Sequence, residues 1–517
     1  MAAFAVDRPV TVGRRRMVTR ARLLIGLLAV ATVAAIITAS SLRPNTAPAA
    51  GSRPSFVVIM TDDQTYQDMA AMPQTTRLIG GAGATFTHAY VSYSLCCPSR
   101  ATFLTGQYAH NHGVRSNSPP TGGFEALDGR HTLPVWLRAA GFDTGHIGKY
   151  LNGYGLRHAA IVPPGWRDWH GAIDKSTYQM WGYKLLEGGA AQTYGSFDVE
   201  DPTLYQTDVF RDKALEFIGT HAADDDPFFL SLAFVAPHGE VQEPGATTLP
   251  YVRPAPRHLG RFRSLRLPRA LAGEKDVSDK PPYVKRLHRA SASTTARIRE
   301  DFRARRESLL AVDDAVAAVV GALERAGRLG STYILFTSDN GFFQGEHRIS
   351  KGKYLPYDPS THVPLMIRGP GVPPGSVSRE LTPNSDLAPT VLDAAGATAD
   401  QPLDGRSLLP FARNPALRTG RPILHEGLVG SDIDSDTVRS RRRVGRFYAI
   451  RTDRFLYVQW KGGARELYDL ARDPKELRSR HGDRRYRRVR DELSRELQRL
   501  RHCRGPDCLR PFAGLRP

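Results

Sequence analysis

Three short apolar segments, residues 55–61, 228–235 and 332–337, constrain the fold of this 517-residue chain. Each is rich in β-branched or aromatic residues without polar alternation, which is typical of strands buried on both faces of a sheet. Residues 306–326 carry apolar residues at helical spacing, and residues 133–140 form a second expected helix. Strands that alternate with helices predict an α/β fold, in which a large mixed, mostly parallel sheet is sandwiched by helices.

Polar residues follow each of the three expected strands. Asp62 and Asp63 come after the first, His238 after the second, and Asp339 and Asn340 after the third. In a parallel sheet the carboxyl ends of the strands meet at one edge, where ligands bind. One strand that ends in aspartate would indicate only a turn. Two polar pairs and a histidine at the same edge predict a functional site.

The residue types at this edge indicate the chemistry of the site. The aspartates and the asparagine are hard oxygen ligands, which suit Ca²⁺ or Mg²⁺ and argue against zinc. Pro98 fits the first turn of a helix, and this places Cys96 at a helix N-terminus, which favours a bound anion and a reactive side chain. The candidates to hold an oxyanion are Arg100, Lys149, His238 and Lys353. These features predict phosphate or sulfate ester chemistry and do not distinguish the two.

Two adjacent cysteines open a recognisable motif. Residues 96–100 read CCPSR and are followed by LTG at 104–106, which resembles the sulfatase signature C-x-P-S-R…L-T-G. In that family a formylglycine-generating enzyme oxidises the cysteine that matches Cys96 to an aldehyde, formylglycine (3-oxoalanine), before the chain folds. Cys97 then occupies the freely varying second position. Neighbouring cysteines do not readily bond to each other, so the resemblance explains them as a precursor and its neighbour.

Further motifs of the sulfatase family follow in the family's order, from about Pro54 to Leu477. The resemblance implies that a calcium ion, with magnesium as an alternative, is held by Asp62, Asp63, Cys96, Asp339 and Asn340. It implies that the catalytic and sulfate-holding residues are Cys96, Arg100, Lys149, His238 and Lys353. His112 is a candidate for substrate binding, or equally for capping a turn.

Four stretches look most like the glucosamine-6-sulfatases, which act on heparan- or keratan-type glycans. They are residues 96–100, 108–112 (YAHNH), 148–152 (GKYLN) and 309–314 (LLAVDD). The implied substrate is a sulfated carbohydrate or an aryl sulfate. In the implied reaction the hydrated aldehyde attacks sulfur with Asp339 as base, and His238 protonates the leaving alcohol.

One position departs from the pattern of many arylsulfatases. They have a histidine two residues after the lysine that matches Lys149, and this chain has Leu151 there. The base that releases sulfate is therefore left open, with His110 and His112 as candidates.

Other functions remain alternatives on the sequence. A phosphate or phosphonate monoester hydrolase of the same superfamily would share the metal carboxylates and could also use formylglycine. A surface protein could bind sulfated glycans without hydrolysing them. The net charge of +19 favours polyanionic partners or a basic solvated surface. No nucleic-acid partner is expected, because no nucleic-acid motif accompanies that charge.

The N-terminal segment predicts export. Five arginines between positions 14 and 22 precede an uncharged run over residues 23–42, and small residues follow at 47–49. This pattern is typical of a signal peptide, and the run is also long enough for a membrane anchor. Either one places the globular part outside the cytoplasm. We therefore assign residues 1–50 to a signal peptide or membrane anchor with its linker.

The remaining chain divides into two expected parts, a catalytic domain over 53–415 and a C-terminal subdomain over 420–517. Residues 240–300 are rich in Pro, Arg and Ser with little periodicity, and they predict a long surface insertion near the substrate. The C-terminal subdomain is expected to contain a small antiparallel sheet with a hairpin over 447–458, followed by a basic helix over 484–500. Cys503 and Cys508 predict a local disulfide in an oxidising compartment.

Overall fold

The computed structural model describes residues 53–221, 226–240, 252–268, 274–429, 431–432 and 443–512. Residues 51–517 form one compact unit, and the division of the chain between 415 and 420 stays a prediction. The expected signal or anchor segment lies outside the described residues. Among the helices that are described, none is both long and apolar enough to cross a membrane.

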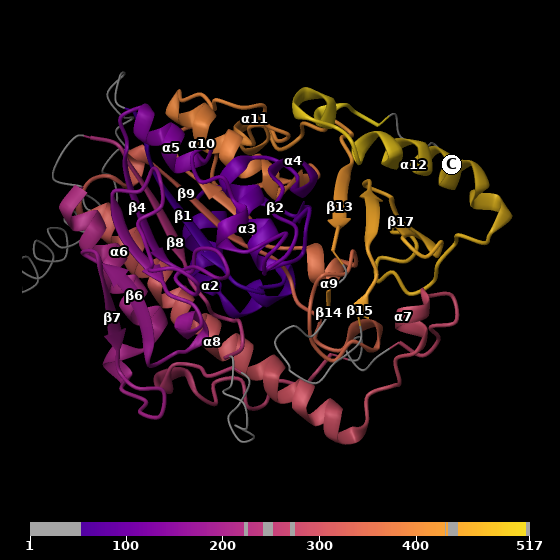
Figure 1. The fold of residues 1–517 in the computed structure, drawn as a ribbon, viewed down its shortest axis with the longest axis horizontal. Helices are drawn as coiled ribbons and strands as arrows, with labels where there is room; N and C mark the ends of the chain where they lie inside the picture. Colours follow the sequence, from indigo (N-terminus) through magenta and orange to yellow (C-terminus); the bar gives the residue numbers. More distant parts are fainter. Residues whose placement is uncertain are drawn as a thin grey trace, which may run out of the picture. The chain divides into compact units, whose positions relative to one another are not determined.

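The centre of the fold is the predicted large mixed sheet (Figure 1). Its five middle strands are parallel and run in the order β9 (Thr332–Ser338), β1 (Ser55–Thr61), β8 (Phe228–Ala233), β4 (Asp143–Gly148) and β5 (Asp168–Ala172). Mostly antiparallel pairings extend the sheet at both sides. Beyond β9 lie β10 (Leu365–Arg368), β2 (Ala84–Phe86) and β11 (Ser376–Ser378), and beyond β5 lie β6 (Tyr183–Glu187) and β7 (Ala190–Tyr194). The three apolar segments of the sequence are thus the three adjacent strands in the middle of the sheet.

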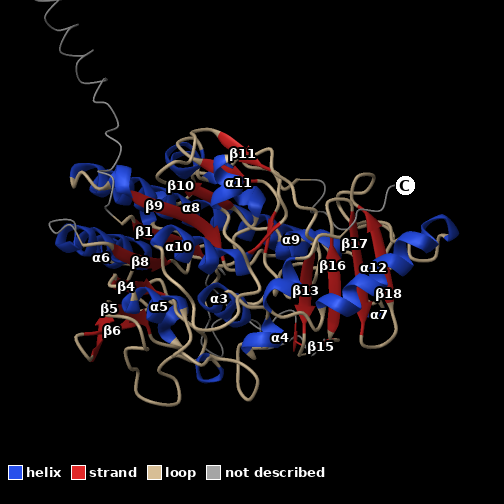
Figure 2. Ribbon diagram, turned by 90° about the horizontal axis from the view of Figure 1, so that it is seen from above, coloured by secondary structure: helices blue, strands red, loops and turns tan. Residues whose placement is uncertain are grey.

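Helices cover both faces of the sheet, as predicted (Figures 1 and 2). In β1, Phe56 and Val58 point into one hydrophobic core, while Val57 and Ile59 point into another. The first core contains α3 (Cys96–Thr105), α5 (Leu133–Ala139), α10 (Leu387–Ala395) and α11 (Leu409–Arg413), and the second contains α6 (Gln206–His221) and α8 (Ala292–Arg325). Successive side chains of a strand point to opposite faces. Both faces of β1 are therefore buried, and its middle residues 56–60 are continuously apolar.

The predicted surface insertion over 240–300 is partly wrong. Helix α8 begins at Ala292, where the Ser291 hydroxyl accepts a hydrogen bond from the Thr294 amide, and not near residue 306. The sequence pattern misses this start because only Ile298 and Phe302 supply buried apolar side chains there. Within the insertion, Val252, Ala255, Val277 and Val284 are also buried, and the short helices η6 (Pro256–His258) and α7 (Pro282–Lys285) form.

The C-terminal subdomain contains the predicted antiparallel sheet and helix (Figure 2). The strands run in the order β13 (Ile423–Gly427), β16 (Phe447–Arg451), β17 (Phe455–Trp460) and β18 (Arg465–Asp469). Strands β16 and β17 form the expected hairpin. Helix α12 (Arg487–Leu500) packs Leu493, Leu497 and Leu500 against apolar side chains of this sheet. Two short strand pairs complete the described strands, β3 (Ala89–Tyr90) with β12 (Thr382–Pro383) and β14 (Ser431–Asp432) with β15 (Arg443–Val444).

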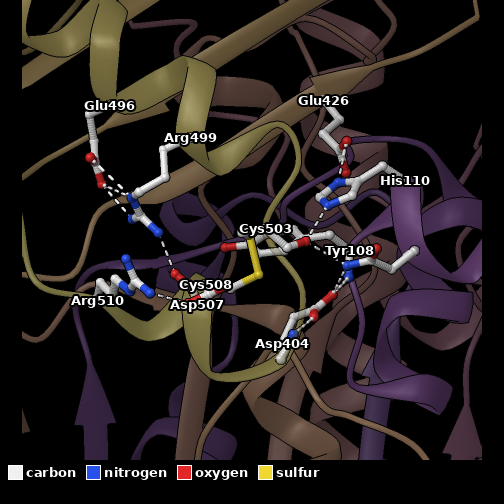
Figure 3. Close-up of a disulfide and its surroundings, with 12 residues drawn as sticks. Tyr108, His110, Asp404, Glu426, Glu496, Arg499, Cys503, Asp507, Cys508 and Arg510 are labelled. Carbon is white, nitrogen blue, oxygen red and sulfur yellow. Dashed lines mark hydrogen bonds and ion pairs between the residues drawn. A yellow bond between two sulfur atoms is a disulfide. The ribbon is translucent and has the colours of Figure 1, made fainter.

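The predicted disulfide between Cys503 and Cys508 is confirmed, and Cys96 and Cys97 are both unbonded. Figure 3 shows that the disulfide loop lies against the short helix α4 (Ala109–His112). The His110 ring contacts the Glu426 carboxylate at 2.9 Å and the Cys503 carbonyl at 2.8 Å. These contacts hold the disulfide loop and β13 against α4, the helix that follows α3.

Candidate active site

The parallel pairing of β1 and β9 brings two polar pairs together. Thr61 pairs with Ser338, so Asp62 and Asp339 leave the sheet at the same edge. The Asp339 amide donates to the Thr61 carbonyl at 3.1 Å, and the Asp63 amide donates to Asp339 Oδ1 at 3.2 Å. The expected convergence of the strand ends is therefore present, and it is held by backbone hydrogen bonds.

Two oxygen atoms in this group are available as metal ligands. Asn340 Nδ2 donates to Asp63 Oδ1 at 2.5 Å. Asp63 Oδ2 and Asn340 Oδ1 are buried and accept no hydrogen bond from the described residues. A buried polar atom without a partner is costly, and a hard cation would satisfy both oxygens. The donor set of carboxylates and an amide oxygen fits Ca²⁺ or Mg²⁺.

Cys96 is the first residue of α3, and its thiol faces this group. The Sγ atom lies 3.6 Å from Asp62 Oδ1 and 2.9 Å from Lys353 Nζ. Atoms of Asp62, Asp63, Cys96 and His238 lie within 4.8 Å of one another, close enough to share a metal ion. The expectation of a reactive side chain at this position stays a prediction. Burial, and after it the charge of Asp62, raise the pKa of the Cys96 thiol above its ordinary value, and a neutral thiol is a poor nucleophile.

Three buried cations surround the carboxylates. Arg100 Nε donates to Asp339 Oδ2 at 2.7 Å, and its Nη2 donates to Asp62 Oδ2 at 3.4 Å. Lys149 Nζ contacts Asp62 Oδ2, and Lys353 Nζ lies 2.6 Å from Asp63 Oδ1. All three side chains are at most 4% exposed. The site therefore combines anionic metal ligands with cations that could hold a sulfuryl or phosphoryl group.

Neighbouring charges shift two of the site's carboxyl groups in opposite directions. Burial alone would raise the pKa of Asp62, but Lys149, His238 and other nearby cations outweigh burial and hold it well below its usual value. Burial and the charge of Asp62 raise the pKa of Asp339. Burial alone would lower the pKa of Lys149, and Asp62 raises it well above its ordinary value. The lysine therefore remains charged in this buried position.

His238 lies beside Asp63. Its Nδ1 atom contacts the Gly239 carbonyl at 2.6 Å, and a carbonyl only accepts, so Nδ1 carries a proton. Its Nε2 atom lies 3.5 Å from Asp63 Oδ2. Tyr178 packs against the His238 ring at 4.6 Å between centroids, and Lys149 Nζ lies 4.6 Å from the centre of the Tyr178 ring. The Tyr178 ring thus contacts both His238 and Lys149.

Comparison with known proteins identifies the chain. A family model described as Sulfatase matches residues 54–397, more than half of the 517 residues. The chain belongs to the sulfatase family. It is therefore a sulfuric ester hydrolase, and a second model, described as N-sulphoglucosamine sulphohydrolase, C-terminal, matches residues 345–503 of this sulfatase.

Named relatives include the arylsulfatase of Volvox carteri, which is 33% identical over 515 residues, 91% of this sulfatase and 78% of the relative. The N-acetylglucosamine-6-sulfatase of Homo sapiens is 35% identical over 387 residues, 72% of this sulfatase and 67% of the relative. A solved structure of a protein in complex with its substrate, D-glucosamine-2-N,6-O-disulfate, superposes with a TM-score of 0.70 at 25% identity, covering 86% of this sulfatase and 97% of that chain. The predicted resemblance to glucosamine-6-sulfatases is supported.

Two other histidines singled out from the sequence lie in a different environment. Both ring nitrogens of His110 are engaged, by Glu426 and by the Cys503 carbonyl. His112 Nε2 lies 3.1 Å from the Thr102 hydroxyl, and its Nδ1 accepts from the Val114 amide at 3.1 Å. Burial lowers the pKa of His112 to about 3. These contacts join α4 to α3, to β13 and to the disulfide loop. A role of His112 in substrate binding stays a prediction.

Two residues of the sulfatase site were not found from the sequence, Tyr178 and Arg305. Tyr178 lies in the short helix η4 (Ser176–Tyr178), which has no motif or periodicity. Arg305 lies on α8, one residue before the start that was predicted for this helix. Because α8 leads into the amino end of β9, its earlier part lies toward the carboxyl edge of the sheet, and this topological signal could have singled out Arg305.

Proposed function

We propose that this sulfatase hydrolyses 6-O-sulfate monoesters of glucosamine-containing sugars, using an aldehyde formed from Cys96 and a divalent cation. The observation that carries the proposal is the single cluster in which Cys96, three carboxylates and three cations meet. The sugar class is supported by the named human relative and by the substrate in the similar solved structure. We further propose export, with residues 1–50 as a signal peptide or anchor.

Cys96 would be the precursor of the nucleophile. A buried neutral thiol is a poor nucleophile, whereas a hydrated aldehyde would supply two hydroxyl groups, one to attack sulfur and one to lose the proton that releases sulfate. Its partner in maturation would be a formylglycine-generating enzyme. The position suits this use, because Sγ lies against both Asp62 and Lys353. An oxygen at the same place would meet a carboxylate and an ammonium group.

The cation would be held by Asp62, Asp63, Asp339 and Asn340, with residue 96 beside them. The unpartnered oxygens of Asp63 and Asn340 support this assignment. A bound Ca²⁺ or Mg²⁺ would neutralise negative charge on the sulfate ester and orient it.

Three side chains would stabilise charge on the sulfuryl oxygens. Arg100, Lys149 and Lys353 are buried and fixed by hydrogen bonds before substrate arrives. Cations that are already in place stabilise a transition state without reorganisation, an effect worth about 3–4 kcal/mol for one donor in other enzymes.

Two groups would move protons. The raised pKa of Asp339, caused first by burial and then by Asp62, makes this carboxylate a stronger base than an exposed aspartate. The Gly239 carbonyl accepts a hydrogen bond from His238 Nδ1, so the cationic ring, protonated on both nitrogens, would give its Nε2 proton to the sugar oxygen and return to the neutral Nδ1–H form. In the net reaction the bond between sulfur and the sugar oxygen breaks, the sugar oxygen gains a proton, and the sulfuryl group keeps an oxygen that comes ultimately from water.

Peptide mass spectrometry and ester turnover test this proposal. We expect a –CHO side chain in place of –CH2SH at position 96, an unmodified Cys97, and hydrolysis of N-acetylglucosamine 6-sulfate. Cys96→Ala should abolish turnover. Cys97→Ala is the matched control, since Cys97 is equally buried but lies in the apolar core, and it should retain turnover.

Two other results would overturn the proposal. Unmodified Cys96 in every molecule, together with binding of the sulfated sugar but no turnover, would indicate a glycan-binding protein. Faster turnover of the corresponding 6-phosphate would indicate a phosphate or phosphonate monoester hydrolase.

A further inference from the structure

Arg305 is a fully buried arginine that contacts the loops behind the active site. It lies on α8, the long helix labelled in Figure 1, and its exposed fraction is 0%. Its Nη1 donates to the Pro237 carbonyl at 3.0 Å, and its Nη2 donates to the Asp63 carbonyl. The guanidinium carbon lies 4.4 Å from the centre of the Phe342 ring. One side chain thus contacts the segments that follow β1, β8 and β9.

The guanidinium of Arg305 is held by carbonyl groups and an aromatic ring. Among the described residues it forms no ion pair with a carboxylate. A buried cation is usually paired with a carboxylate. Arg305 instead bonds two backbone carbonyls, so its effect on the structure is to hold those two carbonyls in place. Arginine suits that geometry because its planar fork can bond two acceptors at once.

The Asp63 carbonyl belongs to a residue in an uncommon backbone conformation. Asp63 has a φ of 67°, in the left-handed region. Only glycine, asparagine and aspartate visit this region readily, and such residues persist where the surroundings hold them. The direction of the Asp63 carboxylate depends on this backbone conformation, and the carboxylate contacts Lys353, Asn340 and His238. A hydrogen bond to the Asp63 carbonyl therefore bears on the position of its carboxylate.

The other carbonyl that Arg305 bonds is that of Pro237, the residue directly before His238. The His238 Nε2 atom faces Asp63 Oδ2 at 3.5 Å. Arg305 therefore holds the backbone of Asp63 and the carbonyl of the peptide bond that leads into His238. We propose that Arg305 is a positioning residue that fixes the Asp63 carboxylate and the His238 imidazole relative to each other. It does so for cation binding and for protonation of the leaving group. This inference rests on the proposed function.

The chain offers a matched control on the same helix. Arg306 is also buried, at 7% exposure, and its guanidinium also packs on an aromatic ring, that of Phe302. Its polar partners are the Asp68 carboxylate at 2.9 Å and the Phe302 carbonyl. Neither partner belongs to the cation site. Loss of Arg306 should therefore lower stability without changing the site.

The first test measures Ca²⁺ affinity by calorimetric titration of the purified full chain. Loss of a group that orients a metal ligand typically weakens affinity by about 10–100-fold. We expect that loss in Arg305→Met and a dissociation constant within about 2-fold of wild type in Arg306→Met. Wild-type affinity in Arg305→Met would overturn the inference. If the wild-type protein itself bound no divalent cation, the proposed function would fail and this inference with it.

Arg305→Lys tests the same point in a variant that keeps the charge, and it decides if Arg305→Met does not fold. An ammonium group cannot bond both carbonyls with the geometry of a guanidinium. We expect Arg305→Lys to bind Ca²⁺ clearly more weakly than wild type, and no more weakly than Arg305→Met where that variant folds. Wild-type affinity in Arg305→Lys would refute the bridging geometry.

The second readout compares leaving groups. A proton donor matters for a sugar alcohol and matters little for a nitrophenolate, which leaves without protonation. With saturating Ca²⁺, Arg305→Met should therefore lose more kcat/KM on N-acetylglucosamine 6-sulfate than on a nitrophenyl sulfate, whereas Arg306→Met should keep the wild-type ratio. Equal losses on both substrates would overturn the part of the inference that concerns His238.

Discussion

The His110–Glu426 contact makes the stability of this sulfatase depend on pH in a defined window. Burial by itself lowers the pKa of His110, but the Glu426 carboxylate and the Cys503 carbonyl outweigh burial and raise the pKa from 6.5 to about 8. The His110 side chain is 12% exposed and that of Glu426 is 0% exposed, so solvent screens the pair little. A raised histidine pKa means that the folded state binds the proton more tightly than the unfolded chain does.

The size and the pH range follow from that shift. About 1.5 pKa units at 1.36 kcal/mol each correspond to about 2 kcal/mol. This contribution is fully present below the unfolded pKa of 6.5 and is lost as the pH rises through the folded pKa of about 8. His110→Gln keeps a polar side chain but cannot carry the charge. We therefore expect the variant to cost about 2 kcal/mol more at about pH 5.5 than at about pH 9.

The assay is urea unfolding of wild type and variant at the two pH values, with the disulfide kept oxidised. His131→Gln is the control, because the His131 side chain is 44% exposed and pairs with Asp400 at 2.8 Å on the surface. Exposed pairs contribute about 0–1 kcal/mol. If His110→Gln costs the same free energy of unfolding at both pH values, the proton is not bound at this contact and the reasoning is wrong.

Three further predictions follow from the burial of individual side chains. Lys353→Met removes a buried ammonium from the active site and should lower kcat/KM on an aryl sulfate by about 100-fold or more, measured on protein with the aldehyde confirmed. Leu497→Ala in α12 should cost about 2–5 kcal/mol of unfolding free energy, against less than about 0.5 kcal/mol for the exposed neighbour Gln498→Ala. Arg421→Met leaves Asp386 as an unpaired charge at 0% exposure and should cost about 3–5 kcal/mol in the same urea assay.

The middle of the fold could be predicted because its strands are buried on both sides. Residues 56–60 and 333–336 are apolar throughout since β1 and β9 face a hydrophobic core on each face of the sheet. The polar residues after them stand out against that background. The outer strands β2 and β11 are only three residues long. The alternation of apolar and polar residues that marks a strand cannot be recognised in so short a segment. Their pairing depends on contacts with distant parts of the chain.

The part of the candidate site that the sequence predicts is the group of carboxylates, because buried carboxylates that meet at one place typically bind a cation. Carboxylates at adjacent strand ends indicate a cation, and this holds without knowledge of the tertiary contacts. Tyr178 and Arg305 escaped prediction because their roles come from what they touch: a tyrosine between Lys149 and His238, and an arginine on two carbonyls.

The burial of α3 bears on when the proposed modification of Cys96 could occur. All ten residues of this helix are buried, and Cys96 itself is 1% exposed. Cys97, one position on, points about 100° away around the helix into the apolar core with Ala101 and Leu104. An enzyme that oxidised Cys96 would need access to a side chain that is 1% exposed, and the folded protein could give that access only by unfolding α3 and its core contacts. We therefore expect formylglycine-generating enzyme to convert the unfolded chain and to leave folded, unmodified protein unchanged. Conversion of the folded protein at the same rate, measured by peptide mass spectrometry, would show that α3 opens far more readily than its burial implies.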